Sequence, residues 1–231
     1  MKNNVAAVLL AAGKGTRIGA EKQFLLIKGK PVFLYSLEKF VTHPKVKKVI
    51  VVVPSKKISY VEHIVSKKIK RGLKKIKIIK GGQTRQSSTF EALKFLERGG
   101  HISGNVVIHD AARPLITSSM ITSVVATAQK FDGAVLGGKA PDLTLRVRGG
   151  IIQNAHPKEE TYSGYTPQCF RFLPLWTAHL SDQRRKTKHP LDNIELLKKY
   201  FPKFKIKIVK VATPIYKITH RPDLKIIKAL L

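Results

Sequence analysis

The sequence predicts an α/β fold built on a doubly wound, mostly parallel, Rossmann-like sheet. Short apolar runs alternate along the chain with stretches of helical period, which is typical of a parallel sheet covered by helices. The first run, residues 5–10, is apolar throughout and rich in branched side chains, as in a strand buried on both faces. With 231 residues and 43% hydrophobic content the chain can bury one large core. We therefore expect residues 1–231 to form a single domain.

The remaining elements follow from the same two patterns. Apolar runs bounded by turn residues predict strands at 46–53, 75–79, 105–108, 134–136 and 205–211, the second of them an outer strand because its residues alternate. Amphipathic stretches predict helices at 31–41, 58–69, 83–96, 117–131, 173–180 and 190–200. Proline supports the start of the first helix and of a C-terminal helix opened by Arg221-Pro222-Asp223, because its fixed φ suits a first turn.

One segment differs from the alternating pattern. Residues 143–147 and 151–152 flank Arg148-Gly149-Gly150, which is a hairpin signal. A lone two-stranded hairpin is barely stable in water, so we expect this arm, residues 139–158, to pack on a second subunit. After the arm the chain is expected to return through Thr166-Pro167-Gln168, with no strand assigned there.

Composition excludes several classes of protein. The single Cys169 rules out an internal disulfide and a cysteine metal cluster. The sequence shows neither a membrane span nor a signal peptide, so we expect a cytoplasmic protein with no membrane partner. Its formal net charge of +30 leaves a basic nucleic-acid-binding protein as an alternative. Zinc-finger spacing and aromatic RNA-binding motifs are missing from the sequence, however, and we expect no specific nucleic-acid partner.

Residues 11–23 have the composition of a polyphosphate-binding loop. Gly13 and Gly15 let backbone N–H groups approach an anion closely, and Arg17 and Lys22 can neutralise its charge. The spacing is not that of a Walker A loop, and the next strand does not end in the acidic residue that a dinucleotide-binding loop needs. An ordinary strand-to-helix turn with surface lysines is the alternative.

Three further polar clusters follow predicted strands, at the edge where open α/β sheets bind ligands. Gly82 and Ser88 leave room for a flat base and offer a hydroxyl group. Asp110 suits Mg²⁺ or a substrate hydroxyl, and Arg113 suits a phosphate. Lys217 lies between two apolar positions, so its side chain is directed to one face. The structural alternatives are a helix cap for the serine, an Asp–Arg pair and an edge-strand lysine.

Taken in order, these motifs resemble those of the 2-C-methyl-D-erythritol 4-phosphate cytidylyltransferases, which are GT-A-like nucleotidyltransferases. The shared patterns are A-A-G-x-G-x-R…K-Q, G-G-x-x-R-x-x-S, H-D-A-A-R-P, T-P-Q and K-I-T-x-x-x-D-L, and they span residues 11–224. The resemblance implies Mg²⁺-dependent transfer of CMP from CTP to methylerythritol phosphate, with release of pyrophosphate, in non-mevalonate isoprenoid biosynthesis. The related ribitol-phosphate cytidylyltransferases are the alternative, although H-D-A-A-R-P favours the first family.

The resemblance also implies roles for single residues. The residues expected around the cytosine and its ribose are Ala11, Ala12, Gly13, Gly15, Gly82 and Ser88. The residues expected to be catalytic are Arg17, Lys22, Lys158 and Lys217. The residues expected on the acceptor side are Asp110, Arg113 and Asp192, with Asp110 also a metal ligand. In this family the hairpin arm embraces a second subunit and completes its active site, which implies a homodimer.

Three departures from the family pattern occur at residues expected on the acceptor side of the site. Lys158 stands where an arginine is usual and keeps the charge without the two-pronged geometry. Leu191 stands where a threonine is usual, and Asn193 where an acid is common. The usual Asp-Thr pair of the arm reads Asp142-Leu143. We therefore expect the identity of the nucleotide to be better defined by the sequence than that of the acceptor.

Overall fold

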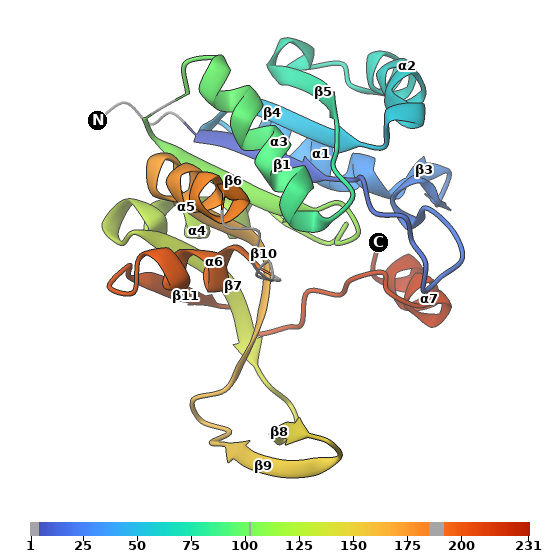
Figure 1. Cartoon of the computed structure of the whole chain (residues 1–231). Coiled ribbons are helices and arrows are strands. Elements are labelled where there is room, and N and C mark those ends of the chain that lie inside the picture. The colour runs from blue at the N-terminus through green and yellow to red at the C-terminus, as the bar shows by residue number, and fades with distance from the viewer. Residues whose placement is uncertain (1–4, 102, 185–191) are drawn as a thin grey trace.

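The computed structural model describes residues 5–101, 103–184 and 192–231 (Figure 1). The strands are β1 (Val5–Leu10), β2 (Leu26–Ile27), β3 (Lys30–Pro31), β4 (Val46–Val53), β5 (Ile76–Lys80), β6 (Asn105–Asp110), β7 (Gly133–Lys139), β8 (Thr144–Arg148), β9 (Ile151–His156), β10 (Tyr162–Arg171) and β11 (Ile206–Lys210). The helices are α1 (Val32–Thr42), α2 (Ile58–Lys68), α3 (Arg85–Arg98), α4 (Ser118–Lys130), α5 (Phe172–Arg184), α6 (Asn193–Tyr200) and α7 (Arg221–Leu230). Three 3₁₀ turns complete the described elements, η1 (Lys22–Phe24), η2 (Ser55–Lys57) and η3 (Leu73–Lys75).

The central sheet has the strand order β11-β7-β10-β6-β1-β4-β5. All of its pairings are parallel except those of β10, which runs antiparallel to both β6 and β7. From β1 the chain adds β4 and β5 on one side and then crosses to place β6 on the other. The crevice between β1 and β6 is therefore the topological switch point, the place where such sheets bind ligands.

Helices cover both faces of this sheet, as the sequence predicts. Helices α1, α2 and α4 pack on one face through side chains such as Phe33, Val61 and Val124. Helices α3, α5 and α6 pack on the other through residues such as Leu93 and Leu196. Successive residues of β1 alternate between the two cores, which explains why this strand is apolar at every position.

A third, smaller apolar cluster joins the C-terminal helix to the N-terminal part of the chain. Ile218 and Ile227 are buried there against Ile18 and Ile27, beside the hairpin formed by β2 and β3. Figure 1 shows α7 beside that hairpin, apart from the helices that cover the central sheet. This cluster brings the segment that carries Lys217 to the edge of the sheet where the glycine-rich loop lies.

Strand β10 is the main difference from the expected elements. The sequence predicts only a return of the chain through Thr166-Pro167-Gln168, with no strand there, yet residues 162–171 form a central strand between β6 and β7. The register with β7 shifts between Tyr165 and Gln168, at the cis peptide bond before Pro167. A proline has no N–H to donate to a ladder and is therefore normally confined to edge strands or bulges. Here the shift in register accommodates Pro167 within a central strand. Strand β6 also runs further than predicted, so that Asp110 is its last residue.

The remaining predictions of secondary structure are confirmed within a few residues, apart from the predicted start of the helix at 190, which lies outside the described residues. Lys217 lies in an irregular segment and not on an edge strand. The predicted hairpin exists as β8 and β9 and projects from the body of the protein (Figure 1). Among the described residues, no helix is both long and apolar enough to cross a bilayer.

Candidate active site

The candidate site lies at the carboxyl ends of β1 and β6. Leu10 and Asp110, the last residues of these two strands, are partners in the parallel ladder. The glycine-rich loop leaves β1 at this point, and the Gly81–Gly82 turn leaves the end of β5 close to it, since a methyl group at Gly81 would lie 2.5 Å from Cβ of Ala12. The order of the strands thus brings together loops that are far apart in the sequence.

Two local features hold the glycine-rich loop in shape. The side-chain amide of Gln23 donates to the carbonyl oxygens of Ala11 and Gly13, each at 2.9 Å. Gly15 has a φ of +66°, and a methyl group there would lie 1.7 Å from the carbonyl oxygen of Ala20. A residue other than glycine could therefore not adopt this turn without moving the chain.

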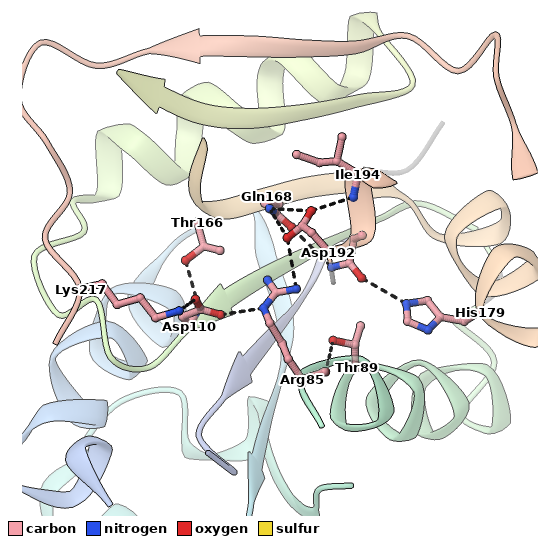
Figure 2. A network of polar contacts seen from close by, with 10 residues as sticks. Arg85, Thr89, Asp110, Thr166, Gln168, His179, Asp192, Ile194 and Lys217 are labelled. Carbon is pink, nitrogen blue, oxygen red and sulfur yellow. Dashed lines mark hydrogen bonds and ion pairs between the residues drawn. The ribbon is translucent and has the colours of Figure 1, made fainter. Parts of the chain in front are cut away.

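Asp110 joins Lys217, Arg85 and Thr166 in the network of polar contacts in the site (Figure 2). One carboxylate oxygen accepts from Nζ of Lys217 at 2.7 Å, and the other accepts from Nε of Arg85 at 3.1 Å. Its backbone N–H donates to Oγ1 of Thr166 at 3.1 Å. Burial alone would raise the pKa of the carboxyl, but Arg85 and Lys217 outweigh it and hold that pKa well below its usual range. Asp110 is therefore ionised at neutral pH.

Asp192 lies behind Arg85, on the side away from Asp110. Its carboxylate is 3.4 Å from Nη1 of Arg85, accepts from the Gln168 amide at 3.1 Å, and caps the first turn of α6 through the N–H of Ile194 at 2.8 Å. Asn193 stands where an acid is common in the family. Here its neutral side chain is fully buried, and its Oδ1 lies 3.2 Å from Nε2 of His179. These contacts fix Arg85 between two acids.

Four cations face the same cleft. Arg17, Lys22, Arg85 and Lys217 line a cavity of about 320 Å³, in which Asp110 is the one lining carboxylate among the described residues. Burial lowers the pKa of Lys22, and the nearby charges of Lys217 and Arg17 lower it further. Cations that are packed against one another in this way favour the arrival of a multiply charged anion. A larger, open cleft of about 900 Å³ adjoins this cavity along Ala12 and Gly82.

The structure brings most of the predicted site residues together. The residues that line the smaller cleft are Ala12, Gly13, Gly15, Arg17, Lys22, Gly82, Ser88, Asp110 and Lys217. Ala11 is buried beneath the glycine-rich loop, and Asp192 lies behind Arg85. Arg113 lines neither cleft, and Lys158 is exposed on the arm. The structure therefore joins the expected nucleotide residues but does not bring Lys158 to them.

Sequence reasoning assigned no role to two residues that shape the site. Arg85 lines the smaller cleft and pairs with both Asp110 and Asp192. Gln23 tethers the glycine-rich loop. Both lie within motifs that resemble the family, namely G-G-x-x-R and K-Q, so their position in a motif was the available signal. Their partners depend on tertiary contacts and could not be read from spacing.

The donor set limits how a metal ion could bind. Among the described residues, no three His, Cys, Asp or Glu side chains are grouped to hold a metal. Each oxygen of Asp110 already accepts from one cation and keeps further lone-pair capacity. Mg²⁺ commonly binds through one or two carboxylates together with substrate phosphates. These residues therefore fit an ion that arrives with a polyphosphate, and they do not form a complete site by themselves.

Comparisons with known proteins agree on one family. The family model described as 2-C-methyl-D-erythritol 4-phosphate cytidylyltransferase matches residues 5–231. Proteins of that name from Clostridium botulinum (strain Loch Maree / Type A3) and Clostridium kluyveri (strain NBRC 12016) are 33% and 36% identical, over 86% and 78% of this chain and 85% and 76% of theirs. The crystal structure of 4-diphosphocytidyl-2C-methyl-D-erythritol synthase from Anaerococcus prevotii has a similar fold, with a TM-score of 0.84 at 21% identity over 98% of this chain and 95% of that one. That of the cytidylyltransferase from Thermus thermophilus gives a TM-score of 0.71 at 25% identity, over 96% of both chains.

Asp110→Asn should destabilise the fold in a pH-dependent way. The change leaves Arg85 and Lys217 without their shared anion, and we expect a loss of about 2 kcal/mol in the free energy of unfolding at pH 7. Because the folded-state pKa is depressed, the contribution of Asp110 is present above the pKa of the unfolded chain, about 4, and is lost as the pH falls toward the lower folded value. Urea unfolding at pH 7 and pH 3 measures this difference.

The matched control for that measurement is Glu38→Gln, which removes an acid paired with Lys30 at the surface. We expect this control to change the free energy of unfolding by less than about 0.5 kcal/mol. An Asp110→Asn penalty that stays the same at pH 7 and pH 3 would show that the charge of Asp110 does not stabilise the site.

Proposed function

The chain belongs to the 2-C-methyl-D-erythritol 4-phosphate cytidylyltransferase family, and we propose that it transfers CMP from CTP to 2-C-methyl-D-erythritol 4-phosphate, releasing pyrophosphate, in isoprenoid biosynthesis. The observation that carries the proposal is the cleft at the switch point, where Arg17, Lys22 and Lys217 converge beside Asp110. The names of the relatives do not favour the ribitol-phosphate alternative. Small phosphorylated substrates and the single, buried Cys169 support a cytoplasmic location.

The proposed reaction depends on the alignment of the reactants and the stabilisation of negative charge more than on a general base. The attacking group is a phosphate monoester, which is largely ionised at neutral pH because its second pKa is about 6. Catalysis can then consist of aligning this oxygen with the α-phosphorus of CTP and stabilising the charge that develops on the pyrophosphate. We expect Arg17 and Lys22 to stabilise that leaving group, and the paired Lys217 and Asp110 in the same cleft to contact the acceptor.

We propose that Mg²⁺ binds together with CTP, with Asp110 as a ligand from the protein. The ion would supply further neutralisation of phosphate charge. Asp110 is suited to this role because it stays ionised between Arg85 and Lys217. Arg85 in turn holds the carboxylate in place from the side of α3, since it is fixed by Asp192.

The arm supports a homodimer. It exposes a set of large apolar side chains, namely Leu143, Leu145, Val147, Ile151 and Ile152, with exposed fractions from 40% to 68%. A hairpin of this kind would not hold its shape alone, and an exposed apolar surface favours burial against a partner. Since the arm projects away from its own site (Figure 1), Lys158 would reach an active site in the other subunit. Each site would then combine residues of two chains.

An assay with two acceptors and two nucleotides tests the proposed activity. With CTP and Mg²⁺, we expect pyrophosphate release with 2-C-methyl-D-erythritol 4-phosphate at a kcat/KM at least about tenfold above that with ribitol 5-phosphate, and weaker activity when UTP replaces CTP. The nucleotide preference follows from the amino group of cytosine. An acceptor in the protein that binds this amino group would be left without a donor when uracil takes its place. Pyrophosphate release with the four nucleotide–acceptor pairs measures both preferences. Comparable turnover with ribitol phosphate would overturn the acceptor assignment.

Lys22→Ala should lower kcat by about 100-fold, the scale for losing one preorganised group that stabilises developing charge. Lys22 is half-buried beside Lys217 and Arg17, so its removal takes a cation from the leaving-group side of the cleft. Steady-state kinetics measures the effect, and the thermal midpoint should change little. Lys39→Ala, an exposed lysine of α1, is the control. A Lys22→Ala enzyme with near-normal kcat would remove this residue from the mechanism.

Lys158→Ala should raise the KM for the acceptor more than the KM for CTP, because Lys158 is proposed to act on the acceptor phosphate of the partner subunit. Mixing Lys22→Ala and Lys158→Ala dimers tests this directly, when the acceptor concentration is well below the raised KM so that both parent dimers have low activity. After random exchange about half of the dimers are mixed, and one site in each mixed dimer is intact, so activity should rise toward about a quarter of the wild-type value. Exchange confirmed by mass with no gain in activity would exclude a role for Lys158 in the other subunit.

A further inference from the structure

Arg113 does not lie where a substrate ligand would be expected. Its guanidinium lines neither the 320 Å³ cleft nor the adjoining larger one. Instead Nη1 donates to the carbonyl oxygen of Ile215, 102 residues further along the chain. The guanidinium also lies over the ring of Tyr165, with its central carbon 5.3 Å from the ring centroid. Among the described residues no ion pair joins Arg113 to a carboxylate, so its charge is used in a hydrogen bond and a cation–π contact.

The backbone of Arg113 is anchored from the opposite side. Its carbonyl oxygen accepts from Oγ of Ser36 at 3.1 Å and lies 3.1 Å from Nε2 of His109. His109 is fully buried, and burial lowers its pKa to about 4, so the ring is neutral at pH 7. A neutral ring with its proton on Nε2 donates to this carbonyl. The backbone of Arg113 is therefore held by these contacts, while its side chain extends to a segment that is distant in the sequence.

That segment carries Lys217. The N–H of Ile218 donates to the carbonyl oxygen of Ala112 at 2.9 Å, and the carbonyl of Ile215 accepts from Arg113. These two contacts bracket Lys217, whose Nζ then reaches Asp110 at 2.7 Å. The segment has no regular secondary structure, so no helix or ladder hydrogen bonds of its own hold it in place. The end of β6 thus supplies Asp110, and the loop after it supplies the contacts that place its lysine partner.

We infer that Arg113 is a positioning residue, which holds residues 215–218 so that Lys217 faces Asp110 and the substrate, and that it does not itself bind the acceptor phosphate. The inference rests on the proposed cytidylyltransferase activity for its kinetic consequence but not for its geometry. The competing assignment has Arg113 turning into the cleft to bind a phosphate. That movement would break the bond to Ile215 and leave the ring of Tyr165.

A double-mutant cycle separates the two assignments. Arg113→Ala should lower kcat/KM by about tenfold and Lys217→Ala by about 100-fold, and the double variant should match Lys217→Ala alone, because Arg113 acts only through Lys217. If Arg113 bound substrate on its own, the losses would multiply to about 1000-fold. Arg113→Gln keeps an N–H donor without the charge, so it should lose less activity than Arg113→Ala. Losses that multiply, or a Gln variant as poor as Ala, would overturn the inference.

Hydrogen exchange tests the geometry without any assay of activity. In Arg113→Ala, amides of residues 215–218 should exchange at least about tenfold faster, while those of β1 stay protected. Arg171→Ala is the matched control, because it removes a half-exposed guanidinium paired with Asp132 at the surface and should leave 215–218 unchanged. Unchanged exchange in Arg113→Ala would overturn the positioning role even if the enzyme is active as proposed. Faster exchange in a chain without transferase activity would instead refute the proposed function alone.

Discussion

The buried carboxylate of Asp110 is the interaction on which the arrangement of the site depends. It gathers Arg85, 25 residues away on α3, and Lys217, 107 residues away near the C-terminus. Burial disfavours its charge, but the two cations compensate and keep it ionised. Without this anion the cleft would hold cations that repel one another, and Arg85 and Lys217 would lose the partner that they share. One acid at the end of a parallel strand thus organises a site for polyphosphate.

The backbone around this acid is fixed before any ligand binds. Gln23 holds the glycine-rich loop through two carbonyl oxygens, and Gly15 adopts a turn that no other residue could adopt without displacing Ala20. Electrostatic catalysis depends on such preorganisation, because groups that are already in place do not have to reorganise in the transition state. The same logic extends to Arg113, which acts on the chain that carries Lys217. The site therefore combines a backbone held by hydrogen bonds with cationic side chains.

Local patterns in the sequence predicted most of the fold and much of this cleft. Glycines, cations and strand ends are signals of short range, so residues such as Gly15, Lys22 and Asp110 could be identified. Strand β10 was missed because Pro167 argues against a central strand, and the irregular pairing that accommodates it is a tertiary feature. The role of Arg113 could also not be predicted from the sequence. Its partner Ile215 is far along the chain, and the choice between carbonyl and phosphate depends on which way the side chain turns.

The net charge of +30 has two separate structural uses. A few cations form the cleft, where Asp110 holds Lys217 and Arg85 through direct contacts. Others lie on the outer strands of the sheet, β5 and β11, which read IKIIK and IKIVK and expose their lysines. Lysines on edge strands oppose pairing with another sheet. Exposed charges are screened within about 8 Å at physiological ionic strength, so they can raise the rate at which anionic substrates arrive but not select among them. Selection must come from the few cations whose positions the buried carboxylate fixes.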